Sequence, residues 1–384
     1  MRIPIIILMS LSAGVLLVAI QYQWIIIHYA NPSPFSTQQI EGRPTPWRVS
    51  YKYHKNNTVY TYNKDIIALK HTTQAATRII NHYFELLEDE NIIHTPVTAT
   101  ICFNEHSTAA FISLSQSPFT VHHTVQNRYT IINDLLTNLQ THIPQLQCVL
   151  FLLNHETFED PFLEFRIPWP IEGFASNQSQ EKPALPTITS RPIHIVLNPS
   201  GHSQHVGRTI GEAFERTITL HIAQSIKAIF EKLNSNILVT ITRSIGDVIS
   251  PLQHINYINK LNADLFIHLG IYHSINITPE ISVYTFCTHP TTDNWKRPID
   301  FMPWYTAHRA HRKSSIAYAT SIAFFLTQEP DIRLITHQSI PYRPLTGIVR
   351  PSVALEIGIP NHTSWESVTV PIAHAIMQCT RLKD

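Results

Sequence analysis

Four side chains of the C-terminal half could do metal chemistry. His202 comes shortly after an apolar run that is typical of a strand, at a tight turn, where an imidazole is well placed as a metal ligand. Glu215 opens a stretch with helical spacing of apolar residues, either as a partner of the helix dipole or as a ligand turned inward. His268 interrupts an apolar strand, and His273 follows that strand. Two imidazoles, a carboxylate and a water molecule are the components of an open catalytic zinc site.

Glu356 is the most informative single residue. It lies inside residues 353–359, a run that is otherwise apolar. A carboxylate that is buried without a partner costs several kcal/mol. We therefore expect Glu356 to be ion-paired, associated with a metal or catalytic.

Five segments, in this order, resemble motifs of the zinc-dependent N-acetylmuramoyl-L-alanine amidases that cleave bacterial peptidoglycan. The resemblance covers about residues 193–384, and five ordered motifs are more specific than any one of them. The segments are Asn198-Pro199-Ser200-Gly201-His202, Glu215-Arg216-Thr217-Ile218-Thr219-Leu220, Thr242-Arg243, Ala263-Asp264-Leu265-Phe266-Ile267 and Leu355-Glu356-Ile357-Gly358-Ile359.

The resemblance implies a zinc ion held by His202, Glu215 and His268. It also implies that Glu356 takes a proton from the zinc-bound water, which attacks the amide between the lactyl group of N-acetylmuramic acid and L-alanine. Glu356 would then return the proton to the leaving amine. The implied substrate is peptidoglycan.

Departures from the family pattern leave an alternative open. The first motif needs a one-residue insertion to bring His202 onto the ligand position, and its Asp and second Gly are replaced. The third ligand position falls on Gly270. His268 lies two residues earlier, on the same strand face but displaced by about 6.6 Å, and His273 would have to reach back from a turn. The alternative is a catalytically degenerate amidase-like protein that binds the cell wall or acts as a scaffold.

The elements around these residues predict an α/β domain over residues 193–384, with a mostly parallel sheet and helices on both faces. Sites on such sheets lie at the carboxyl ends of the strands. The expected strands are 193–197, 237–242, 265–272, 281–286 and 353–359, and the expected helices are 211–233, 252–261 and 314–326.

A small α+β domain is expected over residues 61–174, with helices at 72–87 and 129–143 and strands at 97–103, 109–114 and 148–153. Its element order weakly resembles the GerMN domain of germination and sporulation lipoproteins. We expect this domain to bind or position something rather than to catalyse.

The N-terminus reads as a membrane segment. Residues 1–30 contain an apolar run after Arg2, and about 18 apolar residues nearly span a bilayer. We expect an uncleaved signal anchor, with the rest of the chain facing the periplasm or extracytoplasmic space. Polar, proline-containing residues 31–60 and 175–192 are expected to be linkers.

Composition excludes several classes of protein. With 28 Lys and Arg against 27 Asp and Glu, the formal net charge is +1, and no long basic run is available to bind nucleic acid. The 4 cysteines have no CxxC spacing, which argues against a zinc ribbon or a disulfide-dense scaffold.

Overall fold

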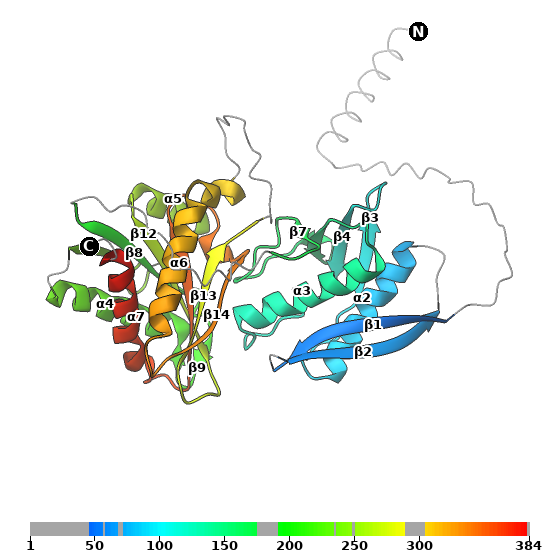
Figure 1. The fold of residues 1–384 in the computed structure, drawn as a ribbon, viewed down its shortest axis with the longest axis horizontal. Helices are drawn as coiled ribbons and strands as arrows, with labels where there is room; N and C mark the ends of the chain where they lie inside the picture. The colour runs from blue at the N-terminus through cyan, green and yellow to red at the C-terminus, as the bar shows by residue number, and fades with distance from the viewer. Residues whose placement is uncertain are drawn as a thin grey trace, which may run out of the picture. The chain divides into compact units, whose positions relative to one another are not determined.

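The computed structural model describes residues 46–56, 58–67, 72–174, 191–233, 236–247, 250–288 and 304–381 (Figure 1). The expected signal anchor over residues 1–30 lies outside these residues. In the described part of the chain, no helix is long and apolar enough to cross a membrane. Residues Pro46–Asp384 form one compact unit.

The C-terminal half is built on a six-stranded sheet in the order β11-β8-β12-β15-β13-β14. The sheet is mixed, because β13 runs antiparallel to β15 while the other neighbouring strands pair in parallel. Four of the five neighbouring pairs are parallel, so the sheet is mostly parallel as expected, with one antiparallel pair. The connection 274–279 between β12 and β13 is too short for a parallel crossover, which needs about a dozen residues or more. The strands are β8 (Ile193–Pro199), β11 (Ile237–Ile241), β12 (Leu265–His273), β13 (Glu280–Phe286), β14 (Arg333–Ile340) and β15 (Ser352–Ile359).

Alternate residues of the central strands serve two separate cores. Ile195, Leu197 and Ile267 pack with α4 (Glu215–Lys232), α6 (Arg312–Leu326) and α7 (Trp365–Arg381). Figure 1 shows α6 and α7 side by side along this sheet. Val196 and Phe266 face the other way and pack with α5 (Pro251–Lys260) and with the α+β domain. Both faces are covered, as expected. His268 and Glu356 have the same parity as Val196, Phe266 and Ala354, so they point into this second core.

The α+β domain has the sheet order β3-β4-β5-β6, with β7 also pairing with β5. Its helices α2 and α3 share one hydrophobic core with these strands, and α3 begins four residues before the expected start because Thr124 caps it. The elements are α2 (Thr72–Asp89), β3 (Ala99–Phe103), β4 (Ala109–Leu114), α3 (Val125–His142), β5 (Cys148–Leu153), β6 (Glu156–Thr157) and β7 (Trp169–Pro170).

A hairpin of β1 (Pro46–Lys55) and β2 (Thr58–Ile67) stands where residues 31–60 were expected to be a linker. Alternate residues of β1 are buried, with Val49 and Tyr51 at 0% exposure, so the strand contributes to the core of the domain. The remaining short elements are β9 (Thr209–Ile210), β10 (Ala213–Phe214), η1 (Trp304–His311) and η2 (Arg343–Leu345).

Candidate active site

Glu356 forms a buried ion pair with Arg208. The Glu356 side chain is 1% exposed and the Arg208 side chain 6%, and Nη2 of Arg208 lies 2.8 Å from Oε1 of Glu356. Burial raises the pKa of Glu356 above its ordinary value, while the neighbouring guanidinium opposes the rise. One of the alternatives expected for Glu356, an ion pair, is therefore what the structure shows.

Arg208 is held on several sides. Its Nη1 donates to the Ile271 carbonyl at 3.2 Å, its Nη2 donates to the His123 carbonyl at 3.2 Å, and its guanidinium carbon lies 4.1 Å from the centre of the Phe162 ring. Burial works to lower the pKa of Arg208, but the charges of Glu356 and Glu215 outweigh it and the pKa is raised. Arg208 is thus a permanent cation beside two carboxylates.

Glu215 is also buried and fully engaged. At the start of α4, its Oε2 accepts from the Arg208 backbone N–H at 2.9 Å and its Oε1 from the Ile271 N–H at 3.1 Å. The loop wraps this carboxylate closely at Gly207, which has φ +75° and where an added Cβ would lie 2.6 Å from Oε2. Only glycine fits there without strain.

Gly270 faces the same space. A Cβ at Gly270 would lie 3.5 Å from Oε1 of Glu215, 3.9 Å from Nε2 of His268 and 3.4 Å from the Tyr342 hydroxyl. A longer side chain at this position would therefore point towards Glu215. Gly270 stands at the position that the resemblance assigns to the third ligand. That position lies close to Glu215 and His268, but glycine has no side-chain atom that could bind a metal.

His268 is buried and hydrogen-bonded to Asn198. It is 5% exposed, and the Asn198 amide donates to its Nδ1 at 3.0 Å while Asn198 Oδ1 accepts from the Thr242 hydroxyl at 2.8 Å. With the Asn198 amide in this orientation, Nδ1 accepts a hydrogen bond and Nε2 carries the ring proton. Burial lowers the pKa of His268 to about 3, with a smaller contribution from His254.

His202 lies on the loop after β8, at intermediate exposure. Its backbone N–H donates to the His205 carbonyl at 2.9 Å, and the two imidazole rings pack with centroids 4.6 Å apart. Burial, then His205 and Arg243, lowers its pKa. His273, the alternative third ligand, is exposed at the end of β12.

The described residues do not present an assembled zinc site. Within the described ranges, no group of three or more His, Cys, Asp or Glu side chains is placed to hold a metal ion. His202, Glu215 and His268 are not brought together as a ligand set, and Glu215 already accepts two backbone hydrogen bonds.

The N-terminus of helix α3 of the α+β domain contacts Glu356. The Val125 N–H, at the first position of the helix, donates to Oε1 at 3.0 Å and to Oε2 at 3.2 Å, and the Tyr284 hydroxyl donates to Oε2 at 3.3 Å. The sequence motifs did not identify Arg208 or Val125 as partners of Glu356. Arg208 lies in a polar loop, and only its position seven residues before Glu215 links it to a motif.

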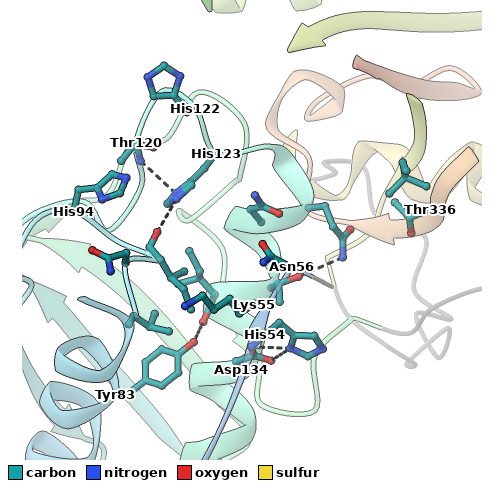
Figure 2. Close-up of a pocket in the computed structure, with 18 residues that line it drawn as sticks. His54, Lys55, Asn56, Tyr83, His94, Thr120, His122, His123, Asp134 and Thr336 are labelled. Atoms are coloured by element: carbon teal, nitrogen blue, oxygen red, sulfur yellow. Dashed lines mark hydrogen bonds and ion pairs between the residues drawn. The ribbon is translucent and has the colours of Figure 1, made fainter. Parts of the chain in front are cut away.

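A cavity of about 550 Å³ lies in the α+β domain and reaches Thr336 of β14 (Figure 2). Its wall includes a pair in which His54 Nδ1 lies 2.9 Å from both carboxylate oxygens of Asp134. His123 also lines it, with Nε2 donating to the Ile92 carbonyl at 3.0 Å, and burial lowers the pKa of His123 to about 4. Polar side chains and apolar ones such as Leu87 and Ile131 both line the cavity, and no sequence motif points to it.

Residues 195–369 match the family model described as N-acetylmuramoyl-L-alanine amidase. This match confirms the resemblance over the C-terminal half and supports a peptidoglycan amidase function. No curated relative matches the chain.

Similar solved structures carry the same description. The amidase AmiC2 of Nostoc punctiforme is 16% identical over 50% of this chain and 96% of its own, with a TM-score of 0.37. The amidase of Clostridium difficile 630 is 16% identical over 50% and 96%, with a TM-score of 0.36. The catalytic domain of CwlV from Bacillus (Paenibacillus) polymyxa var. colistinus is 16% identical over 49% and 96%, with a TM-score of 0.34.

Proposed function

We propose that residues 193–384 hydrolyse the amide between N-acetylmuramic acid and L-alanine in peptidoglycan. The observation that carries the proposal is the family match over residues 195–369. It is supported by the two carboxylates of the matching motifs, Glu215 and Glu356, which both lie beside Arg208 at a buried centre.

Glu356 is the group that we assign to proton transfer. Burial raises the pKa of Glu356 and so brings it closer to neutral pH, which favours a general base. Arg208 supplies a fixed positive charge that could stabilise the oxyanion that develops when the amide carbonyl is attacked. Both oxygens of Glu356 already accept hydrogen bonds, so one of these contacts must open before the carboxylate can take a proton.

No step of this mechanism is assigned to zinc, because the described residues do not present three metal ligands together. The ligand set of His202, Glu215 and His268 stays a prediction from the sequence.

A second candidate function is peptidoglycan binding without cleavage. Two observations favour it. Gly270 stands at the third-ligand position beside Glu215, and Arg208 provides from within the protein the positive charge that balances Glu356.

We propose an extracytoplasmic, membrane-anchored location, supported by the apolar N-terminal sequence and by the location of peptidoglycan outside the membrane. For the α+β domain, the resemblance to GerMN supports a role in binding or positioning.

The test is to incubate the full chain with purified peptidoglycan and to identify released products by mass spectrometry. The amidase proposal expects stem peptides with a free L-alanine amino terminus, and it expects them to disappear in Glu356→Gln. Glu231→Gln, on the exposed side of α4, is the matched control and should release peptides like the wild type. Co-sedimentation of the chain with peptidoglycan, without any released peptide, would instead establish the second candidate.

A further inference from the structure

We infer that the α+β domain is a built-in cover that closes the amidase centre by binding Glu356 and Arg208 directly. The inference rests on the proposed function, because it describes the regulation of that same site. It is carried by three sets of contacts between residues of the α+β domain and residues of the C-terminal half.

The first set places a helix N-terminus on the proposed proton acceptor. Thr124 caps α3 by accepting from the Asn127 N–H at 3.1 Å, and the Val125 N–H is left to donate to both oxygens of Glu356. The N-terminus of a helix carries partial positive charge and stabilises an anion. Glu356 therefore completes the capping of α3, and a carboxylate used in this way is not free to accept a proton from water.

The second set holds the cation of the centre. Phe162 of the α+β domain lies over the Arg208 guanidinium at 4.1 Å, and the His123 carbonyl accepts from it at 3.2 Å. The same Nη2 atom that donates to the His123 carbonyl also binds Oε1 of Glu356 at 2.8 Å. Arg208 thus joins the two parts of the chain through the reaction centre itself.

The third set of contacts lies away from Glu356 and Arg208 and joins the α+β domain to the segment that follows β14. The Glu164 N–H donates to the Pro341 carbonyl at 2.8 Å, and the Arg343 N–H donates to the Phe162 carbonyl at 2.8 Å. The Arg343 side chain also donates to the Asp160 carbonyl at 2.7 Å. A buried ion pair between Arg128 and Asp160 ties this segment to α3, so the cover is a single connected structure.

Substrate access requires this cover to move. The side chains of Glu356, Glu215 and Arg208 have exposures of 1%, 1% and 6%, whereas a stem peptide and a sugar must contact the group that catalyses cleavage of the bond between them. The covered and the active arrangements are therefore different conformations of the chain, and the equilibrium between them sets the activity.

The test uses Val125→Pro in the full chain. Proline at the first helical position keeps the helix, because the N–H that it lacks has no partner within the helix, and here it removes the donor to Glu356. Val125→Ala is the matched control, since it shortens the side chain and keeps the N–H. Loss of a hydrogen bond to a charged group should raise the fraction of molecules in which the α+β domain has moved away from Glu356 by about 10-fold or more.

Two readouts separate the cover from the chemistry. Hydrogen exchange of the segments 120–128 and 205–216 should speed up in Val125→Pro and stay near wild-type rates in Val125→Ala. Release of stem peptides should rise with it. Faster exchange without any peptide release would support the cover and reject the amidase proposal.

Unchanged exchange in Val125→Pro would overturn the inference. If that variant does not fold, Arg343→Ala serves instead, because it breaks the outer contact with the Asp160 carbonyl and leaves the centre intact. It should speed exchange in the same two segments, and unchanged exchange there would overturn the inference equally.

Discussion

The ion pair between Arg208 and Glu356 makes a quantitative prediction about stability. Arg208→Met removes the guanidinium, keeps a long side chain and leaves Glu356 buried without its counter-charge. Breaking a buried pair in this way costs about 3–5 kcal/mol. Glu356→Gln leaves Arg208 with one buried carboxylate neighbour, Glu215, so its cost should lie towards the lower end of that range. The double variant removes both charges together and should cost less than the sum of the two single variants by about 1–3 kcal/mol.

The assay is urea unfolding of the full chain at pH 7.5 and 25 °C, followed by tryptophan fluorescence, for the wild type, both single variants and the double variant. A second signature comes from pH. Burial raises the pKa of Glu356 and Arg208 opposes that rise, so Glu356 should protonate more readily once Arg208 is gone. The cost of Arg208→Met should therefore shrink as the pH falls. Single-variant costs that add within about 0.5 kcal/mol would refute the pairing, because independent sites behave that way.

Three further predictions concern metal, pH and the loop around Glu215. Elemental analysis of the purified full chain should find far less than one zinc per chain, and a content near one would show that the ligands predicted from the sequence do assemble. Burial lowers the pKa of His268 to about 3 and of His123 to about 4, so both are neutral when folded and bind protons on unfolding. As the pH falls below about 6.5, the free energy of unfolding should drop by about 1.4 kcal/mol per pH unit for each imidazole, and His→Gln variants should show a smaller slope. Gly207→Ala should cost about 1–3 kcal/mol more than Gly246→Ala in urea unfolding, since both glycines have positive φ but only at Gly207 would a Cβ meet the Glu215 carboxylate.

Local patterns allowed most of the C-terminal fold to be predicted. Strands and helices such as 237–242 and 314–326 appear within two residues of their expected ends, because apolar spacing and caps act over short stretches of chain. The antiparallel β13–β15 pair was not predicted, since pairing direction depends on tertiary connections. The β1–β2 hairpin was also missed, because the prolines before it dominated the interpretation of that segment.

The candidate site shows the same limit. The apolar neighbours of Glu356 predicted burial and a partner correctly. Its partners Arg208 and Val125 lie 148 and 231 residues earlier in the chain, so no local spacing could identify them. Gly270 could be recognised as the weak point of the metal site from the motif alone, and its distance of 3.5 Å to Glu215 gives that departure a physical meaning.

The most direct test of the amidase function is the identity of the peptides released from purified peptidoglycan by the wild-type chain and by Val125→Pro, in buffers with and without zinc. The proposed amidase function predicts stem peptides that begin with a free L-alanine amino group, in larger amounts from Val125→Pro, and none when Glu356→Gln is added. Stem peptides that all remain attached to N-acetylmuramic acid, with every variant and in both buffers, would contradict it.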